Sequence, residues 1–422
     1  MFAAVGFDMR DGMMQTMRTT NPHKSDTVTT RLNTSRNEEA GCIPNSDVEL
    51  APLQEAAAGM RVALAHDWLT GMRGGERVLE YFCRAFPDAT LSTLISNPAS
   101  VSDTIRSHSI NASPLNRIPG IAKSYRNFLP LMPAAARMLQ IPQADLLISA
   151  SHCVAKSFRK PRGSKHVCVC FTPMRYAWTF FGEYFGGSRA KAALAKPLLA
   201  ALRNWDKAKS DEVDSFIAIS QHVADRIKRF YGRDSQIVYP PVDLCRCVPA
   251  DAPREHEQYD LIVSALVPYK RVDLAVELYT RKGWRLKVVG TGGEFERLKQ
   301  MAGPTVEMFG PLSDAEIVAL YQRCRMLVFP GEEDYGIVPL EAQACGRPVA
   351  AFGRGGALET IADGTSGVFF SEQTLESLED AVTRCAAVDW NSAAIRAHAE
   401  NFGPAQFIAG IAKAVEKVRS VE

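Results

Sequence analysis

The sequence predicts an α/β protein built from two Rossmann-like, doubly wound domains that face each other across a cleft. From residue 60 onward, short apolar runs alternate with amphipathic stretches, a pattern typical of parallel sheets with right-handed helical crossovers. A polar, proline-containing segment interrupts this alternation once, at residues 246–258, and the alternation then starts again. Two such series separated by a linker indicate two domains.

The same pattern sets the expected domain boundaries. We expect an N-terminal Rossmann-like domain over residues 60–245, a linker over residues 246–258 and a second Rossmann-like domain over residues 259–400. Residues 401–422 contain an amphipathic helix that we expect to pack back on the first domain. Residues 1–59 are polar and lack apolar periodicity, so we predict that they do not fold. Met60 precedes the first convincing strand, and one hypothesis places the functional start of the chain near it.

Individual elements follow from apolar periodicity. In the first domain we expect strands at 61–67, 90–95, 144–151, 166–171, 215–220 and 236–242 and helices at 76–86, 192–208 and 221–232. In the second domain we expect strands at 260–267, 285–292, 306–310, 325–330, 348–352 and 367–370, a helix at 314–324 and a final helix at 406–418.

Composition limits the class of protein. The 422 residues are 46% hydrophobic and 23% charged, as in globular proteins, and the net charge of +2 argues against a dedicated nucleic-acid binder. No stretch approaches the roughly 20 apolar residues of a membrane helix, and the first residues, "MFAAVGFDMRDGMM", contain acids where a signal peptide has a basic start. We therefore expect a cytoplasmic protein.

Cysteine spacing does not favour a metal site. The ten cysteines include no CxxC pair, and the CxC pairs at Cys168/Cys170 and Cys245/Cys247 lack a second ligand pair at zinc spacing. The chain also contains no DxD sequence that would hold a divalent cation on a sugar nucleotide. We expect neither a metal nor a cofactor.

Polar residues follow several strands of the second domain, where open α/β sheets bind ligands. Lys270 and Arg271 begin a helix and suit a pyrophosphate, although an exposed helix-start pair is the alternative. Gly290 lies in "VVGTGG", a glycine turn that resembles a phosphate-binding loop but is weak as a lone signal. A third turn, "GRGGALETI", carries Glu359.

The stretch "FPGEEDYGIVPLE" places three acids between a strand and a helix. Seven residues separate Glu333 from Glu341, which is about the third residue of the helix. The alternative is that Glu341 binds no ligand, because a glutamate near the start of a helix is favoured simply by its interaction with the helix dipole. We expect Glu332 and Asp334 to be solvated loop acids.

This stretch resembles the retaining glycosyltransferases of family 4, which have the two-domain GT-B fold. Their motif, E-x-(F/Y)-G-x-x-x-x-E, matches "EDYGIVPLE" at Glu333, Tyr335, Gly336 and Glu341. The resemblance covers most of residues 60–422 and is closest to the mannosyltransferases of bacterial O-antigen and exopolysaccharide assembly. Further matching stretches are "HDWLTGMRGGERVLE", "TPMRYAW", "RIKRFYGRDSQIVYPPVD", "VPYKRVDLAVE" and "GGALETI".

The resemblance implies roles for residues of the second domain. Glu333 would face the transferred sugar, Glu341 would bind the ribose hydroxyls, and Lys270 would neutralise the phosphates. Arg271, Gly290 and Tyr335 would help to bind the donor, and the backbone at Gly336, Ile337 and Val338 would meet the diphosphate at a helix start.

In the first domain, the resemblance places Gly74 and Gly75 beside the donor phosphates and the acceptor. His66 ends the first strand beside the cleft and is a candidate for acceptor contact, and Arg175 lies in "TPMRYAW". The sequence departs from the family at Phe171, where a histidine usually contacts the donor sugar. It departs again at Ala265, where an arginine is usual.

The function implied is a metal-independent retaining transferase that moves a hexose, most simply mannose from GDP-mannose, onto a lipid-linked saccharide. Two alternatives remain: a non-catalytic nucleotide-sugar-binding or scaffold protein, and a GT-B-fold epimerase. Basic and apolar residues interleave in "NRIPGIAKSYRNFLPLMP" and "KSFRKPRGSK". They suit either an anionic membrane surface at the inner face of the plasma membrane or an ordinary solvated loop.

Overall fold

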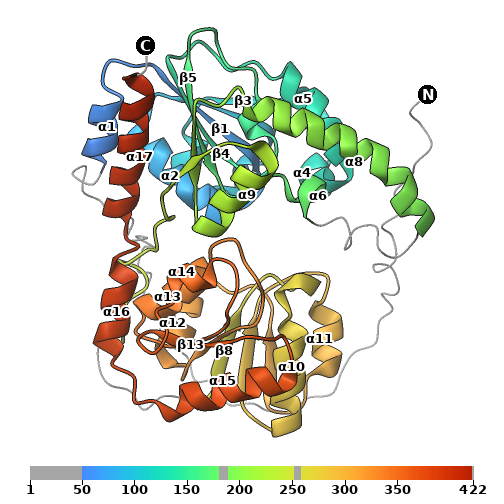
Figure 1. Cartoon of the computed structure of the whole chain (residues 1–422), viewed down its shortest axis with the longest axis vertical. Coiled ribbons are helices and arrows are strands. Elements are labelled where there is room, and N and C mark those ends of the chain that lie inside the picture. The colour runs from blue at the N-terminus through green and yellow to red at the C-terminus, as the bar shows by residue number, and fades with distance from the viewer. Residues whose placement is uncertain (1–49, 180–188, 251–257, 421–422) are drawn as a thin grey trace, which may run out of the picture.

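The computed structural model describes residues 50–179, 189–250 and 258–420. It consists of two parallel α/β domains stacked along the long axis of the molecule, with loops of both domains turned toward each other (Figure 1). The predicted fold class, two Rossmann-like domains, is confirmed.

The first domain is built on a parallel sheet. Within the described part of this domain, the sheet has seven strands in the order β3-β2-β1-β4-β5-β6-β7. They are β1 (Val62–Leu69), β2 (Thr90–Ser96), β3 (Ile110–Ala112), β4 (Leu146–Ser151), β5 (Lys165–Cys170), β6 (Ser215–Ala218) and β7 (Ser235–Ile237). The order reverses between β1 and β4, a switch point that opens a crevice at the carboxyl ends of the strands. The edge strand β3 was not predicted, because it is short and only partly buried.

Helices cover both faces of this sheet. They are α2 (Gly74–Ala85), α3 (Asp103–Arg106), α4 (Ile121–Ser124), α5 (Met132–Met138), α6 (Arg175–Trp178), α8 (Arg189–Ser210) and α9 (Gln221–Tyr231). Short 3-10 turns lie at Pro98–Ser100, Pro114–Arg117, Tyr125–Leu131 and Ala155–Ser157. Local sequence explains the ends of α9: the Ser220 hydroxyl accepts a hydrogen bond from the Val223 amide, and Gly232 ends the helix in the left-handed conformation.

The second domain repeats the design. Its sheet, counted over residues 258–420, has six parallel strands in the order β10-β9-β8-β11-β12-β13. They are β8 (Asp260–Val263), β9 (Leu286–Val289), β10 (Val306–Phe309), β11 (Leu327–Phe329), β12 (Val349–Phe352) and β13 (Gly367–Phe370). The helices are α10 (Val272–Lys282), α11 (Phe295–Met301), α12 (Asp314–Arg323), α13 (Ile337–Ala344), α14 (Ala357–Thr360) and α15 (Leu375–Ala387), and a 3-10 turn lies at Pro268–Lys270.

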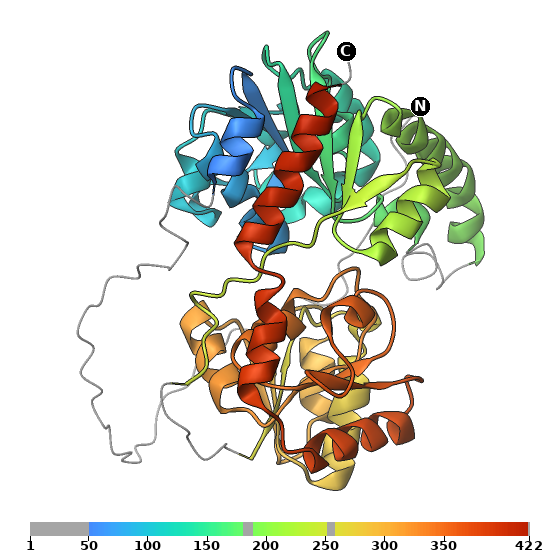
Figure 2. The same ribbon diagram turned by 60° about the vertical axis from the view of Figure 1, so that its left-hand side comes forward.

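The last two helices connect the domains. Helix α16 (Ser392–Glu400) packs on α13 of the second domain, and α17 (Pro404–Arg419) continues onto the first domain (Figure 2). There Phe407 contacts the rings of Tyr81 and Phe82, and the Gln236 side chain donates a hydrogen bond to the Gly410 carbonyl. The chain therefore returns to the domain in which it started.

Helix α1 (Ala51–Ala56) corrects one expectation. It lies within residues 1–59, for which we predicted no folded structure, yet Leu50 and Leu53 are buried and α1 packs along α17. A six-residue helix shows too few turns for its periodicity to stand out, and its apolar partner lies at the other end of the chain. A start at Met60 would remove this helix. Residues 1–49 lie outside the described part of the chain.

Replacing Leu53 by Ala should lower the free energy of unfolding by about 3 kcal/mol, because the side chain is fully buried and its removal leaves a cavity between α1 and α17. Denaturant unfolding of the purified variant measures the change. Glu55→Ala, on the exposed side of the same helix, is the matched control and should change stability by less than about 0.5 kcal/mol. Equal stability of the two variants would contradict the packing of α1 on α17.

Candidate active site

The loops at the carboxyl ends of both sheets meet between the domains. Arg175 follows β5, Ser220 follows β6, and both contact Asp334, which follows β11 in the second domain. Residues from these loops therefore form the two walls of one site.

Lys270 and Glu333 form the centre of the second-domain wall. Their side chains make an ion pair and are only 11% and 21% exposed. The pair depends on Gly331, because a Cβ atom there would lie 2.8 Å from the Cα atom of Lys270. A side chain at position 331 would keep the loops after β8 and β11 apart, so the pairing of Lys270 with Glu333 requires glycine there.

The Glu333 loop is anchored on two sides. The Gly356 amide donates a hydrogen bond to the Glu333 carbonyl at 2.8 Å. The buried Tyr335 hydroxyl donates to the Pro240 carbonyl at 2.8 Å, and its ring stacks on Tyr239. We predicted that Tyr335 contacts the donor. Its side chain instead holds the loop against the segment that leaves the first domain.

Helix α13 begins directly after this loop. Gly336 precedes it with a φ of 95°, and Ile337 and Val338 form its first turn. The amides of a first helical turn have no partner within the helix and carry the positive end of the dipole. The arrangement can therefore receive an anion, and the binding of a diphosphate there stays a prediction.

Glu341 lies one turn further along α13 in a charged network. Its carboxylate accepts hydrogen bonds from Arg246 and from the Tyr321 hydroxyl, each at 3.1 Å. Arg246 also pairs with Asp314, which in turn pairs with Arg77 of α2. Burial raises the pKa of Glu341, although the charge of Arg246 opposes the shift. Sequence reasoning missed Arg246, because nothing in the polar linker sequence distinguishes it.

Asp334 corrects a second expectation. We predicted a solvated loop acid, but its side chain is buried and pairs with Arg175 and Arg226 of the first domain. The Arg175 Nε donates at 3.0 Å, and the Ser220 hydroxyl donates to the Asp334 carbonyl at 2.5 Å. Burial alone would raise the pKa of Asp334, but the charges of the two arginines hold it below its ordinary value.

A second acid joins the domains beside Asp334. The Glu359 carboxylate, on α14, accepts hydrogen bonds from the Gln221 and His222 amides at 2.6 and 3.1 Å. These amides begin α9 of the first domain, so Glu359 caps that helix from across the interface. It also accepts a hydrogen bond from the Tyr239 hydroxyl at 3.1 Å.

Arg271 and Gly290 lie at the neighbouring strand ends. Arg271 adopts a left-handed conformation (φ 51°), and its side chain contacts Asp273 and Gln373. Gly290 directly follows β9, and a Cβ atom there would lie 1.8 Å from the Ser264 carbonyl oxygen. Glycine at this position therefore serves close packing of the β8 and β9 loops.

The first-domain wall contains the other predicted residues. Gly74 begins α2, and a Cβ atom on Gly75 would lie 3.2 Å from His66 and 3.4 Å from Phe171. Phe171 follows β5 and lies in this cluster. His66 is fully buried, and its Nδ1 donates to the Ala150 carbonyl at 2.7 Å. The proposed acceptor contact of His66 is therefore corrected: the side chain does not reach the surface of the site.

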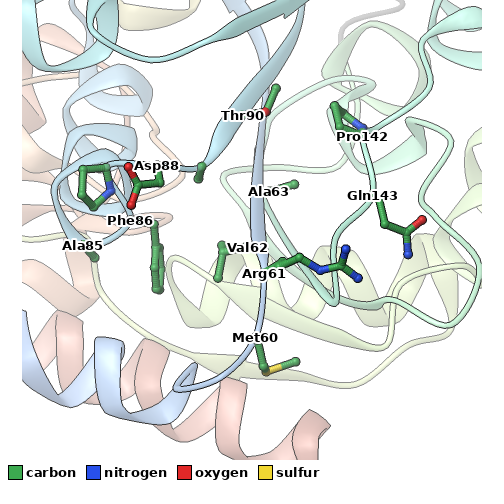
Figure 3. Close-up of a pocket in the computed structure, with 12 residues that line it drawn as sticks. Met60, Arg61, Val62, Ala63, Ala85, Phe86, Asp88, Thr90, Pro142 and Gln143 are labelled. Atoms are coloured by element: carbon green, nitrogen blue, oxygen red, sulfur yellow. The ribbon is translucent and has the colours of Figure 1, made fainter.

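A hollow of about 480 Å³ lies at the opposite edge of the first-domain sheet, where β1 and β2 begin (Figure 3). It is lined by none of the predicted site residues. Among the described residues, no group of three or more His, Cys, Asp or Glu side chains is placed to hold a metal ion. No helix in the described ranges is long and apolar enough to cross a membrane.

Comparison with known proteins agrees with this architecture. The solved structure of the Anabaena protein HepE in complex with UDP and glucose superposes with a TM-score of 0.59 at 16% identity, covering 86% of this chain and all of that one. The lipopolysaccharide outer core galactosyltransferase WaaB superposes with a TM-score of 0.56 at 16% identity, covering 84% of this chain and 99% of that one. Likenesses at this identity show the fold alone.

Each half of the chain matches a glycosyltransferase family model. Residues 72–246 match Glycosyltransferase Family 4, and residues 250–397 match Glycosyl transferases group 1. The chain thus carries both domains of a GT-B glycosyltransferase. A D-inositol 3-phosphate glycosyltransferase of Catenulispora acidiphila is 31% identical over 188 residues, 37% of this chain and 44% of that protein. The chain spans about half the length of the curated relatives it matches.

Replacing Asp334 by Asn should lower the free energy of unfolding by about 3 kcal/mol at pH 7, because two largely covered arginines lose their counter-charge. The folded-state pKa of Asp334 lies below the ordinary 3.8. The ionised carboxylate therefore makes its full contribution to the free energy of unfolding at pH values above the unfolded-state pKa. It is lost as the pH falls through the folded-state value.

Denaturant unfolding from pH 7 to pH 3 should therefore show the difference between the wild type and Asp334→Asn closing below about pH 4. Asp380→Asn, at an exposed pair with Arg384, is the control and should change stability by less than about 0.5 kcal/mol. A difference that stays constant over this pH range would contradict the role assigned to the Asp334 carboxylate.

Proposed function

We propose that this protein is a retaining glycosyltransferase that moves a hexose from a nucleotide sugar onto an acceptor. The observation that carries the proposal is the pairing of each motif glutamate with a cation at the start of α13: Glu333 with Lys270 and Glu341 with Arg246. This places one acid and one cation at a helix start that can receive a diphosphate, and a second acid one turn away.

The chemistry follows from these positions. A departing nucleoside diphosphate carries negative charge, which Lys270 and the first-turn amides of α13 would stabilise. Lys270 would exchange part of its contact with Glu333 for the phosphate, and Glu333 would then be free to face the sugar. In a retaining transfer the acceptor hydroxyl attacks from the face that the phosphate leaves, so the phosphate itself can take the proton. Glu341 would accept hydrogen bonds from the ribose hydroxyls.

No metal is required in this scheme, because protein groups balance the charge of the phosphates. The missing family arginine at Ala265 leaves one cation fewer, and Arg271 is held by Asp273 and Gln373. Lys270 is therefore the principal phosphate cation of the proposal.

We further propose mannose from GDP-mannose as the donor and a lipid-linked saccharide of a bacterial surface polysaccharide as the acceptor. The motif resemblance supports the donor. The likeness in fold to a lipopolysaccharide galactosyltransferase is compatible with the acceptor. Three large apolar side chains of the first domain are exposed by 52%, 67% and 54%, namely Leu131, Met138 and Leu198, and these would suit insertion into the apolar part of a membrane interface.

A second candidate acceptor comes from the relatives. Several are named D-inositol 3-phosphate glycosyltransferase, which favours testing a phosphorylated cyclitol beside a lipid-linked saccharide. A non-catalytic nucleotide-sugar-binding protein would have the same donor site without turnover. Product formation with any acceptor separates it from the enzyme.

Nucleotide sugars should raise the melting temperature, with GDP-mannose giving a larger shift than UDP-glucose or UDP-N-acetylglucosamine, because bound ligand stabilises the folded state.

Lys270→Ala should bind the nucleoside diphosphate about 10- to 100-fold more weakly, the range expected for a lost charge-assisted hydrogen bond. Calorimetric titration measures the affinity.

Lys282→Ala is the control, because this lysine lies at the far end of α10 in an exposed pair with Glu379. It should bind like the wild type. If Lys270→Ala also bound like the wild type, the assignment of the diphosphate to this loop would be wrong.

A further inference from the structure

We propose that His152 contacts the transferred hexose: its Nε2 accepts a hydrogen bond from a sugar hydroxyl beside Phe171, which offers no hydrogen-bonding group. This inference rests on the proposed function and adds a residue to the same site. His152 directly follows β4, which lies between β1 and β5 in the sheet. It therefore stands at the carboxyl edge beside Phe171 and the start of α2.

The surroundings of His152 form an aromatic cluster that leaves one side open. Its ring lies 6.5 Å from Phe171 and 5.9 Å from His66, and it meets Trp68 edge to face at 4.5 Å. The side chain is nevertheless 29% exposed, whereas His66 is fully buried. Of the two histidines in this cluster, His152 can therefore reach a ligand in the site.

A buried carboxylate fixes the orientation of His152. The Oδ2 atom of Asp67 lies 3.1 Å from the Nδ1 atom of His152. The same carboxylate accepts hydrogen bonds at 2.6, 3.0, 2.6 and 2.7 Å from four successive amides, those of His152, Cys153, Val154 and Ala155. Such a cradle leaves Asp67 no freedom to turn away. A carboxylate 3.1 Å from Nδ1 favours the tautomer that carries its proton on Nδ1, which leaves Nε2 as the acceptor.

The charge state of the ring suits an acceptor. Burial lowers the pKa of His152, and the opposing charge of Asp67 reduces the shift without reversing it. Burial alone would raise the pKa of Asp67, but His152, His66 and the backbone donors hold it below its usual range. At neutral pH the pair is therefore a carboxylate beside a neutral imidazole. Within the described residues, Nε2 of His152 has no hydrogen-bond partner.

Arg175 connects His152 to the opposite wall. Its charge interacts with His152, and it interacts as well with Glu333, the acid expected to face the sugar. Arg175 also pairs with Asp334, which holds the two walls in place. A hexose placed between Glu333 and the first domain would therefore have His152 within the same charged environment.

The test compares nucleoside diphosphates with nucleotide sugars. Calorimetric titration with GDP, GDP-mannose, UDP and UDP-glucose measures how much affinity the sugar adds. In His152→Phe, the affinity for the nucleoside diphosphate should be unchanged, whereas the affinity added by the sugar should fall about tenfold. His152→Gln, which retains an acceptor atom, should recover part of it. His108→Phe, a buried histidine of the same domain held by the Ala89 carbonyl, is the control and should behave like the wild type.

Sugar analogues that lack one hydroxyl complete the test and identify the partner atom. One deoxy analogue, which lacks the hydroxyl that His152 binds, should bind the wild type with the same affinity as the parent nucleotide sugar binds His152→Phe. His152→Phe should bind this analogue no more weakly than the wild type does. The wild-type series needs no variant, so a folding defect in His152→Phe would not obscure it.

The outcomes separate the two proposals. A wild type that binds none of these nucleotide sugars would overturn the proposed function, and this inference with it. A wild type that binds them, with an unchanged sugar contribution in His152→Phe, would overturn the role of His152 alone. Equal binding of every deoxy analogue to the wild type would do the same.

Discussion

The arrangement of the site depends on one buried carboxylate. Asp334 belongs to the second domain, but its charge is balanced by Arg175 and Arg226 of the first. A buried acid without these partners would be costly, so the pairing specifies one relative position of the two domains. Glu359 adds to it by capping α9. The motif acids on either side, Glu333 and Glu341, are thereby placed opposite the first-domain loops.

The charges of the site are paired before any ligand enters. Glu333 is matched by Lys270, and Glu341 by Arg246. In the proposed function, a diphosphate arriving at α13 would meet a cation whose partner it can displace, and this exchange would couple phosphate binding to the release of Glu333. The network from Glu341 through Arg246 and Asp314 reaches Arg77 of the first domain. The two domains are thus electrostatically connected at the site.

Several positions of the site could be predicted because they follow local rules. Strand ends in a parallel sheet meet at one edge, so the turns carrying Lys270, Gly290 and Glu333 had to lie near one another. Contacts of Asp334 could not be predicted, because its partners Arg175 and Arg226 lie 159 and 108 residues away, in the other domain. One signal was overlooked: Asp67 interrupts the apolar run "RVALAHDWL", and a charge inside a buried strand requires partners.

The sequence by itself determined the fold class, because alternating strands and helices can bury their apolar faces only as layered parallel sheets. It also determined the spacing of Glu333 and Glu341, which depends on one turn and one helix. Only the tertiary structure decided their partners. Arg246 lies 95 residues from Glu341 and Arg175 lies 159 residues from Asp334, so these contacts depend on how the domains dock. The same holds for α1, whose apolar face is covered by α17 from the far end of the chain.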